Sequence, residues 1–490
     1  MSLRIAVAFL SGRQTVVEAK PDWTINDLRR AAELSLGAGV ATLMTGTGQV
    51  LEGSATLSQA GLQNEETLTA TIRPAMIAAT NKAFAWIALD VTAWGHPRTG
   101  GDCTRVQDRL VDVRQIQSTH GAFAALCSDG SVVTWGDMAG GDSSRVRHRL
   151  QQVQQLQASH GAFAAVLRDG SVVTWGHLGF GAESRAVQGR LEGVRAVQAN
   201  KAAFAAILEN GQVVTWGRAD SGGDSSDEQD DLRDVRAIQA SNQAFAAIRG
   251  DGSVVTWGDG SHGGRSERVQ DELYDVCAIQ ATNSSFAALR TDGSVVTWAG
   301  TFGGGDSSSV QTQLREVQQI QSSEGAFAAL KADGSVVAWG APAFGGDSSS
   351  VQEQLHDVKC IQSSSDAFAA LRADGTVWSW GDTEHCKRSA AVQDQLRDVC
   401  EIQATDQAFA GLRVDGSVVT WGHKMYGGDS GPVQSQLQGV SSIQSSRSAF
   451  AALLGDGSVV CWGDAASGGA GPSLPHSQST TQAARAGYQS

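Results

Sequence analysis

A fifteen-residue segment, AFAAIRGDGSVVTWG at residues 244–258, recurs through most of the chain and constrains the fold most strongly. Ten copies are recognisable, the first of them shortened, and the spacing between successive copies is 41 residues, once 40. Sequence periods of about 20 to 50 residues are typical of solenoids, propellers and other repeat arrays. The tryptophans of the ten copies are Trp94, Trp135, Trp175, Trp216, Trp257, Trp298, Trp339, Trp380, Trp421 and Trp462.

Within the segment, two short apolar runs flank Asp251 and Gly252. Asp-Gly between apolar runs indicates a two-residue hairpin turn of type I′, which needs positive φ at both central residues. This turn predicts that Ala246 faces Trp257 across the hairpin. Because side chains alternate along a strand, Phe245 would lie on the face opposite Trp257. Both faces are apolar, so we expect each hairpin to be covered on both sides.

A further strand should precede each hairpin, as at residues 276–280, and a glycine-rich connector should follow it, as at residues 304–317. Asp306 or Ser307 can cap a short helix in that connector, since apolar residues recur on one helical face after it. Each unit is therefore predicted to contain three strands and a helical turn.

This pattern, FAAL, then Asp-Gly, then SVVTWG and a glycine-rich stretch, resembles repeats of the regulator of chromosome condensation family, which build β-propellers. The resemblance covers about four-fifths of the chain and implies a propeller-like ring. Two departures stand out: the family's histidine before the apolar strand is absent, and Gly-Gly-Asp replaces its Gly-Gln-Leu-Gly segment. Because propellers usually have about four to eight blades, an open β-solenoid or superhelix is the alternative for ten units.

Residues 1–73 do not share the period and resemble ubiquitin-like β-grasp domains. Their order is a strand hairpin around residues 3–19, a helix capped by Asp22 or Thr24, and two short strands near residues 42–44 and 68–72. The conjugated members of that family end in Gly-Gly, whereas this segment runs on into Pro74. The resemblance therefore implies a built-in module that is not attached to other proteins.

The same resemblance implies an apolar patch around Leu43 and Met44 that docks on ubiquitin-system or proteasome receptors. The alternative is that these two residues fill the core of the small domain. We predict no catalytic, cofactor-binding or metal-binding residue elsewhere. His385 and Cys386 are adjacent but have no partners at metal-ligand spacing.

Composition excludes several other classes of function. The net charge is −14 with a pI near 5.1, which argues against binding to a nucleic-acid backbone. No apolar run is long enough to span a membrane, and the N-terminal run reads as a strand rather than a signal peptide. Seven cysteines without a CxxC pair, among them Cys277 and Cys400 in one repeat position, indicate reduced thiols in a cytoplasmic or nuclear protein.

Two polar residues recur with the period. The aspartates of the Gly-Gly-Asp motif are expected to cap helices rather than to bind calcium, because one aspartate per 41 residues is too sparse for a calcium β-roll. The glutamines of the Ile-Gln strand are expected to form a structural ladder, with a binding surface as the alternative. The aspartates are Asp102, Asp142, Asp224, Asp306, Asp347 and Asp429, and the glutamines are Gln117, Gln157, Gln198, Gln239, Gln280, Gln321, Gln362, Gln403 and Gln444.

We therefore expect a mainly β protein with a ubiquitin-like domain at 1–73, an array of ten repeats at 76–463 and a disordered tail at 464–490. The leading hypothesis is a non-enzymatic protein-interaction scaffold or adaptor linked to the ubiquitin system. The alternative is a regulator of a small GTPase of the guanine-nucleotide exchange type, which the repeat resemblance implies at no particular residue. A component of a ubiquitin ligase comes third. In each case the expected partners are proteins, without nucleic acid or membrane.

Overall fold

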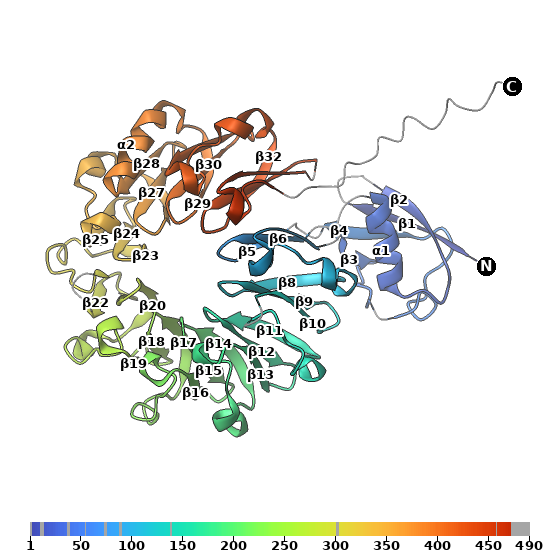
Figure 1. Cartoon of the computed structure of the whole chain (residues 1–490), viewed down its shortest axis with the longest axis horizontal. Coiled ribbons are helices and arrows are strands. Elements are labelled where there is room, and N and C mark those ends of the chain that lie inside the picture. Colours follow the sequence, from blue (N-terminus) through green and yellow to red (C-terminus); the bar gives the residue numbers. More distant parts are fainter. Residues whose placement is uncertain are drawn as a thin grey trace.

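The protein is mainly β, and its strands fall into a small N-terminal sheet and ten repeated sheets (Figure 1). The computed structural model describes residues 2–9, 14–36, 40–53, 55–72, 76–87, 91–137, 140–299, 303–456 and 458–471, with only the backbone for residues 34, 72, 76 and 383–387. No helix in these ranges is both long and apolar enough to cross a membrane.

The N-terminal sheet has the predicted ββαββ order. Its strands are β1 (Leu3–Phe9), β2 (Gln14–Ala19), β3 (Val40–Met44) and β4 (Thr67–Ile72), arranged β2-β1-β4-β3 with β1 and β4 parallel. Helix α1 (Ile25–Leu36) is capped by Thr24 rather than by Asp22. The Thr24 hydroxyl accepts a hydrogen bond from the Asp27 amide (3.1 Å), and the Asp27 carboxylate accepts one from the Thr24 amide (2.8 Å), which is a reciprocal cap.

Each of the ten repeated units forms one antiparallel three-stranded sheet in chain order. The first strands are β5 (Met76–Ala79), β8 (Val113–Ser118), β11 (Val153–Ala158), β14 (Val194–Ala199), β17 (Val235–Ala240), β20 (Val276–Ala281), β23 (Val317–Ser322), β26 (Val358–Ser363), β29 (Val399–Ala404) and β32 (Val440–Ser445). The middle strands are β6 (Ala83–Ile87), β9 (Ala122–Cys127), β12 (Ala162–Leu167), β15 (Ala203–Leu208), β18 (Ala244–Arg249), β21 (Ser285–Arg290), β24 (Ala326–Lys331), β27 (Ala367–Arg372), β30 (Ala408–Arg413) and β33 (Ala449–Leu454). The third strands are β7 (Val91–Gly95), β10 (Val132–Gly136), β13 (Val172–Gly176), β16 (Val213–Gly217), β19 (Val254–Gly258), β22 (Val295–Ala299), β25 (Val336–Gly340), β28 (Val377–Gly381), β31 (Val418–Gly422) and β34 (Val459–Gly463).

The predicted hairpin register is wrong by one residue. Phe245, not Ala246, lies opposite Trp257, and the two rings stack with centroids 5.2 Å apart on the same face of the sheet. The reason is the turn: Gly252 has φ +80°, whereas Asp251 is not among the residues with positive φ, so a type I′ turn is excluded. The Gly252 amide donates to Arg249 O (3.0 Å) and the Arg249 amide to Ser253 O (2.9 Å), a type I turn followed by a glycine bulge.

This register lets the sheets stack on one another as predicted, with both faces buried. Phe245 and Trp257 pack against the Ala203, Ala205 and Ile207 side of the preceding sheet, and the side chains of these residues are at most 4 % exposed. Small alanines on one sheet thus receive the large rings of the next. Since a fully buried aromatic side chain contributes roughly 2–3 kcal/mol, these interfaces are the main source of cohesion between neighbouring units.

The connectors hold consecutive units together through the same tryptophan. The Trp257 indole N–H donates to Gly222 O (3.1 Å), a connector residue 35 positions earlier, and seven further units repeat this bond with the equivalent glycine. The ninth unit differs, because the Trp421 indole donates to Ser379 Oγ (3.0 Å). The connectors contain short 3₁₀ turns, and helix α2 (Thr383–Val392) replaces part of one of them.

Residues 464–471 were expected in a disordered tail, but the structure places them at the junction of the last and first units. Gly468 O accepts the Trp94 indole N–H (3.0 Å), so the C-terminal segment occupies the position of a connector for the first sheet. Phe84 and Trp94 also form one buried cluster with Ala449 and Ala451 of the last sheet. These contacts close the array into a ring, while residues 472–490 lie outside the described residues.

The first strands surround the centre of the ring, and the third strands lie toward its outside (Figure 1). The N-terminal domain lies beside the second unit, where the Arg29 guanidinium of α1 forms an ion pair with Asp112 (2.5 Å). The shortened turn of the first unit, at residues 88–90, lies outside the described residues.

Candidate functional site

Ten short turns between the first and middle strands form a belt around one end of the central opening. At the corresponding position of each turn, the backbone N–H donates to the carbonyl of the next unit, and nine such bonds of 2.9–3.3 Å are present. At the tenth junction a side chain substitutes: the Arg447 guanidinium donates to Asn81 Oδ1 (3.2 Å). We call these ten positions the inner turn residues: Asn81, His120, His160, Lys201, Asn242, Asn283, Glu324, Ser365, Asp406 and Arg447.

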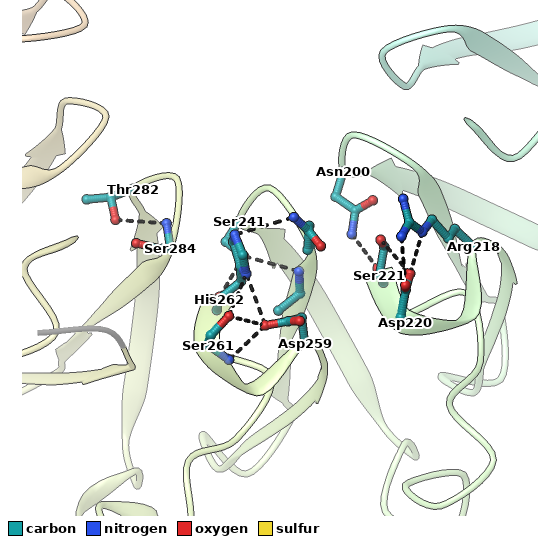
Figure 2. A network of polar contacts seen from close by, with 12 residues as sticks. Asn200, Arg218, Asp220, Ser221, Ser241, Asp259, Ser261, His262, Thr282 and Ser284 are labelled. Carbon is teal, nitrogen blue, oxygen red and sulfur yellow. Dashed lines mark hydrogen bonds and ion pairs between the residues drawn. The ribbon is translucent and has the colours of Figure 1, made fainter. Parts of the chain in front are cut away.

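A buried polar residue before each inner turn residue ties the turn to a second loop (Figure 2). Ser241 Oγ accepts the Ala244 amide (3.1 Å) and donates to His262 O (2.7 Å). Asn200 makes the equivalent pair, accepting from the Ala203 amide (2.7 Å) and donating to Ser221 O (2.6 Å). The second loop is the 3₁₀ turn that follows the third strand, so it lies on the same side of the ring as the inner turns.

We call these second loops the outer turns. They cover residues 97–99, 178–180, 219–221, 260–262, 342–344, 424–426 and 465–467. Local side chains fix their shapes, as Figure 2 shows for Asp259, which accepts hydrogen bonds from the Ser261 amide (2.8 Å) and from His262 Nδ1 (3.0 Å). The Ser261 hydroxyl, followed by His262, lowers the pKa of Asp259 to about 2, so this cap stays ionised across the physiological range.

The ten units agree at most positions that build the sheets and differ from one another at the two sets of turns. The stacked phenylalanine and tryptophan occur in all ten units, and the hairpin at the opposite end is Asp-Gly in eight of them. The inner turn residue takes seven different types, and the four residues after Trp-Gly read HPRT, DMAG, HLGF, RADS, DGSH, APAF, DTEH, HKMY and DAAS in the nine units that keep this pair. The inner and outer turns together form one face whose side chains change from unit to unit, which we call the variable face; the residues before the hairpin turns at the opposite end vary as well.

Charges are distributed unevenly around the belt. His120, His160 and Lys201 are exposed and consecutive, and the two imidazole rings lie 4.5 Å apart. Burial is the main cause that lowers the pKa of both histidines, and the nearby Arg447 lowers it further. On the other side, Glu324 and Asp406 introduce negative charge, and burial raises the pKa of Asp406 although its carboxylate pairs with Arg447 (2.6 Å).

The inner turns surround a polar cavity of about 940 Å³. Its walls consist of the inner turn residues, the buried serine, threonine and asparagine residues before them except Ser159, and the last residue of each first strand except β8 and β11. No group of three or more histidine, cysteine, aspartate or glutamate side chains able to hold a metal ion occurs among the described residues.

The residues predicted from the ubiquitin-like resemblance separate in the structure. Leu43 lies in the core of the N-terminal domain and is 1 % exposed, whereas Met44 is partly exposed. Met44 pairs with Thr69, which pairs with Ala8 in the next strand, so these three residues lie in a row across the sheet. A partner that docks on this domain could therefore contact Met44, but not Leu43 without rearranging the core.

The recurring aspartates were expected to cap helices, but they form local turns instead: where a 3₁₀ segment follows, its N-cap is the next residue (Cys103, Ser348 or Ser430), without a side-chain cap bond. Asp306 Oδ1, for example, accepts the Ser308 amide (2.9 Å), and the other five form the same bond with the residue two positions later. The predicted glutamine ladder does not form: among the nine glutamines, which are all within the described ranges, a side-chain bond joins only Gln157 and Gln198 (3.1 Å). The side chains of His385 and Cys386 are outside the described atoms.

Sequence reasoning missed the variable face. Its signal was available as the positions at which the units disagree, but only the folded sheets place the two sets of turns together.

The six cysteines outside α2 are all unpaired, and Cys277 and Cys400 are exposed, in agreement with the prediction of reduced thiols.

No protein family matches the sequence, and no curated protein matches it. Among solved structures, the CRINKLY WD40 ectodomain of the receptor kinase ACR4 from Arabidopsis thaliana is 15 % identical over 54 % of this chain and 93 % of its own, with a TM-score of 0.32. Yeast RCC1 (Prp20), solved with Kap60 bound, is 16 % identical over 50 % of this chain and 73 % of its own (TM-score 0.31). The ubiquitin-like domain of Plasmodium falciparum Dsk2 is 17 % identical over 15 % of this chain and 100 % of its own (TM-score 0.14). With TM-scores this low, these likenesses support no conclusion about what the chain does.

Proposed function

We propose that this protein is a non-enzymatic protein-interaction scaffold whose repeat ring binds partners through the variable face. The observation that carries the proposal is that the inner and outer turns change side chains from unit to unit on near-identical sheets, and that the inner turns line the central cavity. Turns joined to a rigid sheet framework can change side chains without altering the fold, and binding residues are disproportionately found on such loops. The backbone belt fixes the turns, so a partner would meet a surface that is already ordered.

The test compares partners of the intact chain with those of a variant, called the uniform variant, in which asparagine occupies seven of the ten inner turn positions. Asparagine already occupies three inner turn positions, so substitution by asparagine should preserve the backbone bonds. Proximity labelling should lose specific partners in the uniform variant and keep them in a control with four exposed connector substitutions. The belt substitutions are His120→Asn, His160→Asn, Lys201→Asn and Glu324→Asn, and the control substitutions are Arg145→Ser, Arg185→Ser, Glu267→Ser and Glu353→Ser.

The result shows whether partners bind the variable face or another surface of the ring. Unchanged labelling in the uniform variant, or equal losses in both variants, would contradict a binding role for this face. Circular dichroism and thermal unfolding of both variants check that the ring is intact before the partner sets are compared.

We further propose that the N-terminal domain links the scaffold to the ubiquitin system. The element order and the partly exposed row of Ala8, Thr69 and Met44 support this role, and the ion pair with the repeat ring involves Arg29 of α1 rather than this row. Titration of the full chain with a ubiquitin-associated receptor domain should show binding that Met44→Glu weakens and that Glu18→Lys on β2, at the other edge of the sheet, changes less. Absence of binding by the unmodified chain would remove this link.

The alternatives from the sequence remain a regulator of a small GTPase and a component of a ubiquitin ligase. Both rest on resemblance alone, and no described cluster of residues favours either. A nucleotide-release assay across several GTPases tests the first: acceleration by the intact chain would make it the leading function.

A further inference from the structure

The positively charged side of the belt stands out because its charges are not neutralised within the protein. Lys82, His120, His160 and Lys201 come from four consecutive units, and all four residues are exposed. Neither Lys82 nor Lys201 forms an ion pair with an acid in the described part of the chain. We call these four residues the basic arc.

The groups around the two histidines are mostly basic. His120 is influenced by Arg447 and Lys82 and by one acid, Asp137, while His160 is influenced by His120, Lys201 and Arg447. The Asn81 amide lies 3.2 Å from His120 Nε2, which adds a further polar group. An anion arriving at the arc would therefore gain favourable interactions with both lysines and would favour protonation of the imidazoles.

The opposite side of the belt carries negative charges, and two of its carboxylates have partners within the protein. Glu324, Asp366 and Asp406 lie there, but the Asp406 carboxylate is paired with Arg447 and Asp366 accepts a hydrogen bond from the Gln407 amide (3.3 Å). An acidic ligand would be repelled by this side and attracted to the basic arc, so the cavity mouth gives it one preferred position.

We propose that the basic arc binds an acidic peptide segment of a partner protein, with glutamate or aspartate carboxylates contacting Lys201, His120 and His160 at the mouth of the central cavity. This proposal rests on the proposed scaffold function and specifies the chemistry of one partner. The buried hydroxyl and amide side chains before the inner turn residues are already hydrogen-bonded within the turns, so they define the cavity walls while the exposed arc supplies the recognition. A segment rather than a folded domain fits, because the cavity has a volume of only about 940 Å³.

The proposal predicts a pH dependence with a definite sign. The free histidines have pKa values lowered by burial and by neighbouring cations, so they are mostly neutral at pH 7.5. A bound carboxylate raises their pKa, which means that binding takes up protons and becomes tighter as the pH falls toward 5.5. Binding through Lys82 and Lys201 alone would show no such change over this interval.

The experiment uses the full chain and a fluorescein-labelled peptide of eight glutamates flanked by Gly-Ser, measured by anisotropy at low salt. The triple variant His120→Ser, His160→Ser and Lys201→Ser is compared with Asn283→Ser, which changes the same belt position without removing a positive charge. Ser365 already occupies this position in the eighth unit, so serine is compatible with the turn. We expect at least tenfold weaker binding for the triple variant, less than twofold for Asn283→Ser, and tighter binding by the unmodified chain at pH 5.5 than at pH 7.5.

Two outcomes would overturn the proposal: octaglutamate binding no better than an uncharged Gly-Ser peptide, or equal binding by the triple variant and the unmodified chain. Either failure would leave the scaffold function standing if the uniform belt still loses labelled partners. If the octaglutamate experiment fails and the uniform variant also keeps its labelled partners, the variable face is not a binding surface.

Discussion

Gly468 should be critical for joining the last unit to the first. Its φ is +98°, and a Cβ at this position would lie 2.5 Å from Phe84 Cδ2. Alanine would therefore incur the strain of a left-handed conformation, about 1–2 kcal/mol, and an overpacking cost of about 1–3 kcal/mol. If the segment moves away, the hydrogen bond from the Trp94 indole adds about 1 kcal/mol. The junction should lose roughly 3–6 kcal/mol in total.

A matched control lies three residues later. Gly471 also has positive φ, +74°, but a Cβ there would come no closer than 3.6 Å to Cys461. Gly471→Ala should therefore cost only the backbone strain, about 1–2 kcal/mol. The difference between the two variants measures the contact with Phe84 rather than the general intolerance of glycine positions.

Native-state hydrogen exchange of the full chain is the assay, because it reports local opening unit by unit. A difference of about 3 kcal/mol corresponds to roughly a hundredfold faster exchange. We expect this acceleration in β5–β7 and β32–β34 for Gly468→Ala, little change in β17–β19, and a smaller effect for Gly471→Ala. Equal exchange in β5–β7 for both variants would refute the reasoning, and a rod-like scattering profile of the unmodified chain would refute ring closure itself.

Three further predictions concern individual residues. Ala299 has φ +89° where the other nine units have glycine, so Ala299→Gly should stabilise the sixth unit by about 0.5–1 kcal/mol in urea unfolding, and a loss of stability would show that this strain is already relieved. Cys277 and Cys400 are exposed and should react rapidly with a thiol reagent, whereas burial raises the pKa of Cys461 to about 12 and should delay its reaction until unfolding; early labelling of Cys461 would contradict its position. The pKa of Asp259 in the folded protein is about 2, below its usual value near 4. The ionised carboxylate therefore stabilises the outer turn at residues 260–262 fully above pH 4, and this stabilisation is lost toward pH 2. Asp259→Asn should flatten that decline in the exchange protection of residues 260–262, and an unchanged acid profile would exclude this role.

The amino-acid sequence by itself determined the repeating unit. The recurrence of Phe245 and Trp257 every 41 residues, the Asp-Gly turns and the glycine-rich connectors are local patterns, and they specify three strands and a capped turn wherever they occur. The cap of Thr24 and the turn of Asp306 follow the same logic, because a side chain and an amide two or three residues away meet whatever the surroundings. The N-terminal ββαββ order was also predictable from local signals.

The tertiary structure decided what depends on contacts distant in sequence. Asp-Gly is compatible with two turn types, and the type that sets Phe245 opposite Trp257 prevails where stacked rings can pack into the alanines of the preceding sheet. Ring closure through Gly468 was not predictable, since its partner Trp94 lies 374 residues away. The variable face arises for the same reason: antiparallel strands bring the inner and outer turns to one side, and only the assembled ring gathers residues from ten units around one cavity.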